Sequence, residues 1–160
     1  KEMSYYDEES GQHIIPYVIE PSAGVDRSAL AFLTEAYREE LDDKGDIRVV
    51  LRFHSRLAPI KVAILPLSRK ENLVSLTQEV YATVRQHFMA QYDDTQSIGK
   101  RYRRQDEIGT PLCITVDFET LEDRAATIRN RDTMQQIRVS LDSLPAALAD
   151  QMREMDRSFE

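Results

Sequence analysis

The sequence contains no tryptophan, only one cysteine, five glycines and six prolines among its 160 residues. So little glycine and proline excludes a collagen-like or low-complexity chain, and a single cysteine excludes a disulfide-stapled scaffold. That cysteine, Cys113, lies in an apolar run at 111–116, where a buried and unreactive thiol is the simplest interpretation. The residues that are present, 41% hydrophobic and 31% charged, are typical of a globular protein.

Long apolar segments are also lacking. No stretch reaches the roughly 18 consecutive apolar residues that a membrane-spanning helix needs. Residues 1–20 carry acidic side chains where a secretory signal would be apolar. We therefore expect a soluble, cytoplasmic protein that has no membrane partner.

Positive charge is scarce overall, with 21 lysines and arginines against 28 acidic residues and a pI near 5.1. The whole imbalance lies in residues 1–44, which hold 11 acids and 4 bases, whereas the rest of the chain holds 17 of each. An acidic pI argues against non-specific coating of nucleic acid, but a neutral segment can still carry a local basic patch. Composition alone therefore neither indicates nor excludes RNA binding.

The first 44 residues read as strand, turn and helix. The apolar run 14–19 predicts an extended strand, and Pro21 and Gly24 mark a turn. A helix over 25–40 is predicted by a single apolar stripe, which consists of Leu30, Leu33, Tyr37 and Leu41. A charged exit at 41–45 marks a boundary. Because one strand and one helix cannot form a core, this part reads as the edge of a larger domain.

From residue 59 the pattern is that of an α/β domain. The continuous apolar run 62–67 is typical of a strand buried on both faces, and Ser68 with Glu71 suggests a capping box that opens a helix to about residue 87. Further strands are predicted at 89–92, 112–118, 126–131 and 135–140, and further helices at 98–108 and after Ser143. This order predicts an α/β fold with a mixed sheet of about five strands flanked by helices.

Residues 20–27 combine groups that suit a small-molecule pocket. On a strand, Glu20 and Ser22 point to the same side, and a carboxylate with a hydroxyl suits an ammonium group. Gly24 lets a ligand approach the backbone, and Arg27 at a helix start suits a phosphate. The same residues also fit a plain turn between a strand and a helix, which is the interpretation that spacing alone favours.

Residues 17–27, YVIEPSAGVDR, resemble motif 3 of the class II aminoacyl-tRNA synthetases in the form carried by the glycyl-tRNA synthetase family. Four downstream segments resemble the C-terminal anticodon-binding domain of that family: 57–67 (LAPIKVAILPL), 98–111 (IGKRYRRQDEIGTP), 115–123 (TVDFETLED) and 129–134 (RNRDTM). The resemblance covers essentially the whole chain and is specific to the dimeric glycine enzyme. It implies three parts: the tail of a catalytic domain at 1–44, a connector at 45–58 and an anticodon-binding domain of the class IIa fold at 59–160.

The resemblance also implies roles for individual residues. Glu20, Ser22 and Gly24 match the positions that bind the substrate glycine. The family's ATP-binding positions are matched by Gly24, Val25, Asp26 and Arg27. The implied parent is a homodimeric ligase that joins glycine to tRNA(Gly) through a glycyl-adenylate, with ATP and Mg²⁺. Motifs 1 and 2 of the family have no counterpart here, so we expect the chain alone to be inactive, with no complete catalytic set, no metal site and no cofactor of its own.

A second set of candidate residues is basic. The predicted helix at 98–108 is dense in lysine and arginine with Tyr102 interleaved, and the predicted strand at 126–131 places two arginines on one face. Such groups suit the phosphates and splayed bases of an anticodon loop. The candidates for tRNA contact are Lys100, Arg101, Arg103, Arg104, Arg129 and Arg131. The alternative is a solvated helix whose arginines pair with Asp106 and Glu107.

Other chemistry is less well supported. The three histidines, His13, His54 and His87, lack the spacing of a metal site or a catalytic triad, and the acidic pair at 93–94 reads as a turn. Two alternatives stay open. One is a small independent nucleotide-binding enzyme, although no glycine-rich phosphate loop follows residue 67. The other is a non-catalytic interaction module with an anticodon-binding-like fold.

Overall fold

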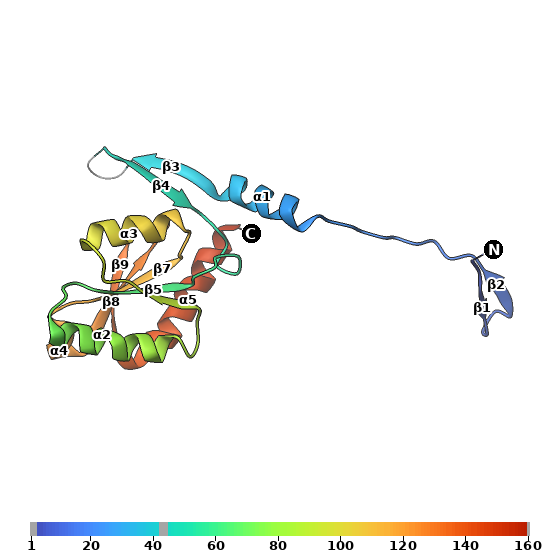
Figure 1. The fold of residues 1–160 in the computed structure, drawn as a ribbon. Helices are drawn as coiled ribbons and strands as arrows, with labels where there is room; N and C mark the ends of the chain where they lie inside the picture. The colour runs from blue at the N-terminus through green and yellow to red at the C-terminus, as the bar shows by residue number, and fades with distance from the viewer. Residues whose placement is uncertain (1–2, 42–44, 160) are drawn as a thin grey trace. The chain divides into compact units, whose positions relative to one another are not determined.

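The structure, a computed structural model, describes residues 3–41 and 45–159, and the chain divides into two units, one up to Leu30 and one from Ala31 onward. The first unit contains a hairpin of β1 (Tyr5–Asp7) and β2 (Gln12–Ile14), followed by the start of α1 (Val25–Ala36) (Figure 1). Residues 15–24 belong to no helix or strand. The predicted strand at 14–19 is therefore wrong beyond Ile14, because β1 pairs only with Gln12–Ile14.

The helix predicted to reach residue 40 ends at Ala36, and this prediction is wrong for its last turn. Tyr37–Leu41 form β3, which pairs antiparallel with β4 (Ile47–Leu51). A spacing of four residues puts Tyr37 and Leu41 on one face of a strand as well as near one face of a helix, so the apolar stripe fits both structures. β4 lies inside the segment predicted as a connector. Residues 42–44 of the predicted charged exit at 41–45 lie outside the described residues.

The second unit is built on a mixed sheet with the strand order β6-β5-β7-β8-β9. β5 (Val62–Pro66) runs parallel to β6 (Ala90–Tyr92) and to β7 (Leu112–Val116), and β8 (Ala125–Asn130) and β9 (Gln136–Ser140) continue the sheet in antiparallel fashion. Every residue of β5 and β7 is buried, as their continuous apolar runs predict. The predicted α/β fold with a five-stranded mixed sheet is confirmed.

Helices cover both faces of this sheet. Figure 1 shows α2 (Glu71–Val84) and α5 (Leu144–Asp156) on one face and α3 (Ile98–Glu107) on the other. The main core lies on the α2 and α5 side, and its fully buried side chains include Ile64, Leu73, Leu112, Ile114, Ile128, Leu144 and Leu148. Since burying one such side chain contributes roughly 1.5–3 kcal/mol, this face supplies most of the apolar stabilisation.

The ends of the helices differ from the sequence prediction in places. The residue before α2 is Lys70, and no side chain caps this end, so the predicted capping box of Ser68 and Glu71 is wrong. α2 ends at Val84 rather than near residue 87. Three short helices complete the unit: α4 (Thr120–Asp123), η1 (Leu141–Ser143) and η2 (Arg157–Phe159). Of the helices in the described ranges, none is long and apolar enough to span a bilayer.

Candidate nucleic-acid interface

The residues predicted to bind glycine and ATP lie in the first unit. Glu20, Ser22 and Gly24 belong to the segment without regular structure, and Val25, Asp26 and Arg27 form the first turn of α1. All residues from 20 to 27 are exposed. Because the strand that was expected to orient Glu20 and Ser22 is absent there, the structure does not place the two side chains on one face. Their roles stay predictions.

Three of the six arginines and lysines predicted to contact tRNA are buried. Arg101, Arg129 and Arg131 are 3%, 7% and 1% exposed. Arg131 donates hydrogen bonds to the backbone carbonyls of Gly109 and Phe53, both at 2.9 Å. Arg101 donates to four backbone carbonyls, those of Pro66, Asp94, Thr95 and Gln96. In this fold these guanidinium groups tie loops together, because a buried charge must be fully hydrogen-bonded.

Arg129 belongs to a buried ionic cluster centred on Asp106 of α3, which is 1% exposed. The Asp106 carboxylate accepts hydrogen bonds from Nη1 and Nη2 of Arg129, at 2.9 and 3.1 Å, and from Nε of Arg48, at 2.8 Å. The Arg129 guanidinium also lies over the Tyr102 ring, 4.7 Å from its centroid. Burial alone would lower the pKa of Arg129, but its bonds to Asp106 outweigh that effect and raise it. The cluster therefore joins β4, α3 and β8.

Lys100, Arg103 and Arg104 keep part of their side chains at the surface of α3. Arg103 lies 3.6 Å from Asp46. Arg104 donates to Asp93 Oδ2 at 2.6 Å. The alternative in which these arginines pair with Asp106 and Glu107 is therefore wrong in its partners, because Asp106 points into the buried cluster. The prediction of RNA contact by the basic helix now depends on these three side chains, which are exposed at Lys100 and Arg103 and half-buried at Arg104.

A second polar surface lies where the parallel strands β5 and β7 end. In open α/β sheets, ligands bind at the carboxyl ends of parallel strands, where the loops converge. Arg69 and Lys70 follow β5, and Phe118 follows β7. Lys70 Nζ lies 5.0 Å from the centroid of the Phe118 ring, which is 40% exposed. An exposed ring beside a cation is a platform on which an unpaired base stacks.

Arg138 of β9 borders this platform. Its guanidinium donates to both oxygens of Asp117, at 2.9 and 3.2 Å, and to both oxygens of Asp123, at 2.7 and 3.0 Å. Burial acts to raise the pKa of Asp117, but hydrogen bonds from Arg138 and Thr120 outweigh it and lower that pKa. Arg138 is therefore fixed in place while 29% of its side chain stays exposed. We call Arg69, Lys70, Asp117, Phe118, Glu119 and Arg138 the carboxyl-edge surface.

Comparison with known protein families matches residues 61–151 to the anticodon binding domain. The chain belongs to the anticodon-binding domain family. Beyond that match, it is 54% identical to the glycine–tRNA ligase of Corynebacterium efficiens over 156 residues, which cover 95% of this chain and 34% of that protein. The glycine–tRNA ligase of Clostridium acetobutylicum is 54% identical over 153 residues, 96% of this chain and 33% of that protein. That of Ruminiclostridium cellulolyticum is 55% identical over 145 residues, 91% of this chain and 31% of that protein.

The chain thus spans about a third of the length of these curated relatives. The resemblance to glycyl-tRNA synthetases found in the sequence is confirmed. Within the chain, the anticodon-binding domain match contains the whole carboxyl-edge surface, α3, Asp106 and Arg129, but not the hairpin of β3 and β4, to which Arg48 of the buried ionic cluster belongs.

Sequence reasoning missed Lys70 and Phe118 as candidates. The available signal was their position at the ends of the apolar runs 62–67 and 112–118, because the carboxyl ends of parallel strands lie at one edge of a sheet. The density of lysine and arginine in 98–108 instead predicted the RNA contact there. That density does not distinguish a buried arginine from an exposed one.

The remaining candidate groups have structural surroundings. Cys113 is buried, and burial raises its pKa to about 12. His54 Nδ1 lies 3.3 Å from Asp156 Oδ1. Asp93 accepts hydrogen bonds from the backbone and hydroxyl of Thr95, as the turn after β6 requires. Across 3–41 and 45–159, no group of three or more metal-ligating side chains is close enough together to hold a metal ion.

Proposed function

We propose that this chain is the anticodon-reading part of a glycine–tRNA ligase and that its partner is tRNA(Gly). The observation that carries the proposal is the anticodon-binding domain match over 61–151, together with identity of about 54% to several glycine–tRNA ligases across at least nine tenths of the chain. The overall charge of −7 makes a local contact surface, rather than general attraction to RNA, the basis of binding.

The carboxyl-edge surface supplies the groups that such binding requires. Phe118 offers a ring for a splayed base, and Lys70 beside it offers a cation for a phosphate. Glu119, whose side chain is 80% exposed, suits the exocyclic amino group of a base, because a carboxylate accepts hydrogen bonds. The ion pairs of Arg138 with Asp117 and Asp123 hold these loops in place before RNA arrives, which lowers the entropic cost of binding.

For the longer protein we propose the activity that the relatives' names state, the ligation of glycine to tRNA. In this proposal the parent is a cytoplasmic homodimer. ATP supplies the energy for adenylate formation, and Mg²⁺ neutralises the charge of its phosphates. The proposed glycine-binding residues are Glu20, Ser22 and Gly24, and the proposed ATP contacts are residues 24–27. In the described part of the chain, every residue of the segment 20–27 is exposed. No step of the reaction is therefore assigned to it, and the chain alone is proposed to be inactive.

The test is a binding measurement with the full 160-residue chain. Fluorescence anisotropy at moderate salt compares labelled tRNA(Gly) with the same tRNA carrying three replaced anticodon bases. We expect at least about tenfold tighter binding of the natural anticodon, since each wrong base costs roughly 1–3 kcal/mol when it is read directly. Equal affinity for the two RNAs would contradict the proposal. A slope of affinity against salt that is the same for both RNAs serves as the control for phosphate contacts.

A further inference from the structure

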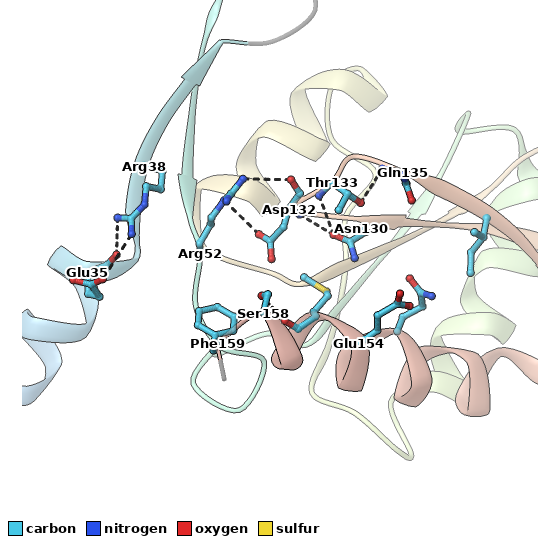
Figure 2. Close-up of a pocket in the computed structure, with 13 residues that line it drawn as sticks. Glu35, Arg38, Arg52, Asn130, Asp132, Thr133, Gln135, Glu154, Ser158 and Phe159 are labelled. Carbon is cyan, nitrogen blue, oxygen red and sulfur yellow. Dashed lines mark hydrogen bonds and ion pairs between the residues drawn. The ribbon is translucent and has the colours of Figure 1, made fainter.

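Figure 2 shows a cavity of about 620 Å³ that is lined by residues of the second unit. It lies at the edge of the sheet where β7 begins, opposite the carboxyl-edge surface. Asn130, which lines it, pairs with Leu112 at the start of β7, whereas Phe118 follows the end of that strand. Its walls come from the end of α1 and the start of β3, from Arg52 just after β4, from β8, β9 and the turn between them, and from the end of α5 with η2. The lining side chains that matter here are Arg52, Asn130, Gln135, Ile137, Gln151 and Phe159.

The charged side chains around this cavity give no positive excess. Two arginines, Arg38 and Arg52, face three carboxylates, those of Glu35, Asp132 and Glu154. Arg52 is already engaged, because its Nη2 lies 2.8 Å from Glu40 and its Nε lies 3.8 Å from Asp132. The lining thus has one more carboxylate than it has arginines, so it disfavours a free phosphate, whereas an uncharged ligand meets no such repulsion.

Hydrogen-bonding groups and apolar surface occur together in the lining. The side-chain amides of Gln135 and Gln151 make no hydrogen bond within the described part of the chain, and Arg52 Nε is buried there without a hydrogen-bond partner. A buried polar atom without a partner in the protein indicates a place for a ligand or water. Phe159 exposes 48% of its surface, and Ile137 exposes 41%. A flat neutral molecule with donors and acceptors along its edge matches this combination.

We propose that this cavity binds one unpaired nucleobase of the RNA, as a base subsite separate from the carboxyl-edge surface. The proposal rests on the proposed function, because it takes the partner to be RNA. Amide side chains read the edges of bases, and an aromatic ring stacks on their faces. The five residues of β7 separate the cavity from the carboxyl-edge surface by about 15 Å. At that separation, the two sites bind different nucleotides of one loop.

The experiment combines a cavity variant with RNA that lacks single bases. Affinity of the full chain for the tRNA(Gly) anticodon stem-loop is measured for the double variant Gln135→Ala, Gln151→Ala. The matched control is Gln86→Ala, since Gln86 is an exposed glutamine beyond α2 and is not among the residues that line the cavity. We expect the double variant to bind about tenfold more weakly and the control to bind normally. Thermal unfolding of each variant establishes that the fold is kept.

A series of stem-loops, each abasic at one loop position, then locates the base. The double variant and the original protein should bind one of these stem-loops equally, because that RNA no longer carries the base that enters the cavity. A loss of the same size on every stem-loop would overturn the proposal, since it would mean an indirect effect on the fold. Unchanged affinity of the double variant would also overturn it and is the result expected if a protein segment fills the cavity. The proposed function is tested separately, by whether the unmodified chain discriminates between anticodons. If it does, the proposed function stands even when the cavity proposal fails; if it does not, the proposed function is refuted.

Discussion

Asp106 holds Arg129 through two parallel hydrogen bonds, of 2.9 and 3.1 Å, in a place that solvent scarcely reaches. The same carboxylate also binds Arg48, 58 residues earlier in the chain. A short helix, a hairpin strand and a sheet strand therefore share one buried anion. Each arginine has its charge neutralised only while the other elements are in place, which makes their folding interdependent.

Replacement of Asp106 by alanine should lower the free energy of unfolding by about 3–5 kcal/mol, because it leaves two buried guanidinium groups without their anion. Urea denaturation measures this loss. Asp150→Ala is the control, since Asp150 forms an exposed pair with Arg153, and pairs of that kind contribute less than about 1 kcal/mol. A similar small loss for both variants would show that the cluster does not stabilise the fold.

Gly109→Ala should be destabilising by roughly 2–4 kcal/mol, for reasons of backbone conformation and space. Gly109 has a φ of +80°, and an added Cβ would lie 2.5 Å from Phe53 Cδ2 and 2.9 Å from the Leu51 carbonyl oxygen. Gly99→Ala is the opposite case, because Gly99 lies within α3 and an added Cβ meets nothing within 4 Å. We expect it to gain up to about 1 kcal/mol from helix propensity. Thermal melts of the two variants should therefore shift in opposite directions.

Cys113 should react with a thiol reagent at pH 8 at least about 100-fold more slowly in the folded protein than in urea, because only the thiolate reacts. Its folded pKa of about 12 lies above the ordinary value of about 8.5. Above pH 8.5 the unfolded chain loses a proton that the folded chain keeps, so stability should fall as the pH rises through that range. Cys113→Val should remove this part of the pH dependence. Rapid labelling of the native protein would contradict the buried thiol.

Arg138→Met should raise the pKa of Asp117, because burial then acts on that carboxyl group without the opposing bond from the guanidinium. Since the folded pKa of Asp117 is lowered in the original protein, its contribution to stability is complete above about pH 4 and is lost as the pH falls below that value. The variant should show a weaker loss in acid. Carboxyl NMR titration measures the shift, and Arg153→Met, at an exposed pair with Asp150, should leave Asp117 unchanged.

Phe118→Ala should weaken binding of tRNA(Gly) about tenfold or more while changing stability little, because base stacking on a ring contributes roughly 1–3 kcal/mol. The ring is 40% exposed and belongs to no core cluster. Tyr17→Ala, at a fully exposed ring outside the anticodon-binding domain match, is the control and should bind normally. Equal affinities for the two variants would remove the carboxyl-edge surface from the RNA site.

The sheet could be predicted from the sequence because its central strands are buried on both faces, and continuous apolar runs such as 62–67 carry that signal. The structure of residues 14–19 could not be predicted in the same way, since an apolar run does not show whether a neighbouring strand is present to pair with it. The turn from helix to strand at Tyr37 was hidden because its apolar residues have spacings that fit both structures. The hydrophobic pattern of the sequence therefore predicted best those elements that are completely buried.

The site was predicted less well than the fold. In the sequence, nothing distinguishes the buried arginines Arg101, Arg129 and Arg131 from exposed ones. Their partners are carbonyl and carboxylate groups up to 78 residues away. No local spacing contains that information. The platform of Lys70 and Phe118 depends on two loops that only the parallel pairing of β5 and β7 brings together.

Arg48 belongs to a strand that precedes the family match, yet its guanidinium faces Asp106 inside it. Shortened versions for crystallography or NMR should therefore keep the β3 and β4 hairpin instead of beginning near residue 59. Truncation there would also delete Phe53, which covers Gly109, and Ser55, which binds Asp156. The practical minimum for laboratory work is the compact body that begins at Ala31.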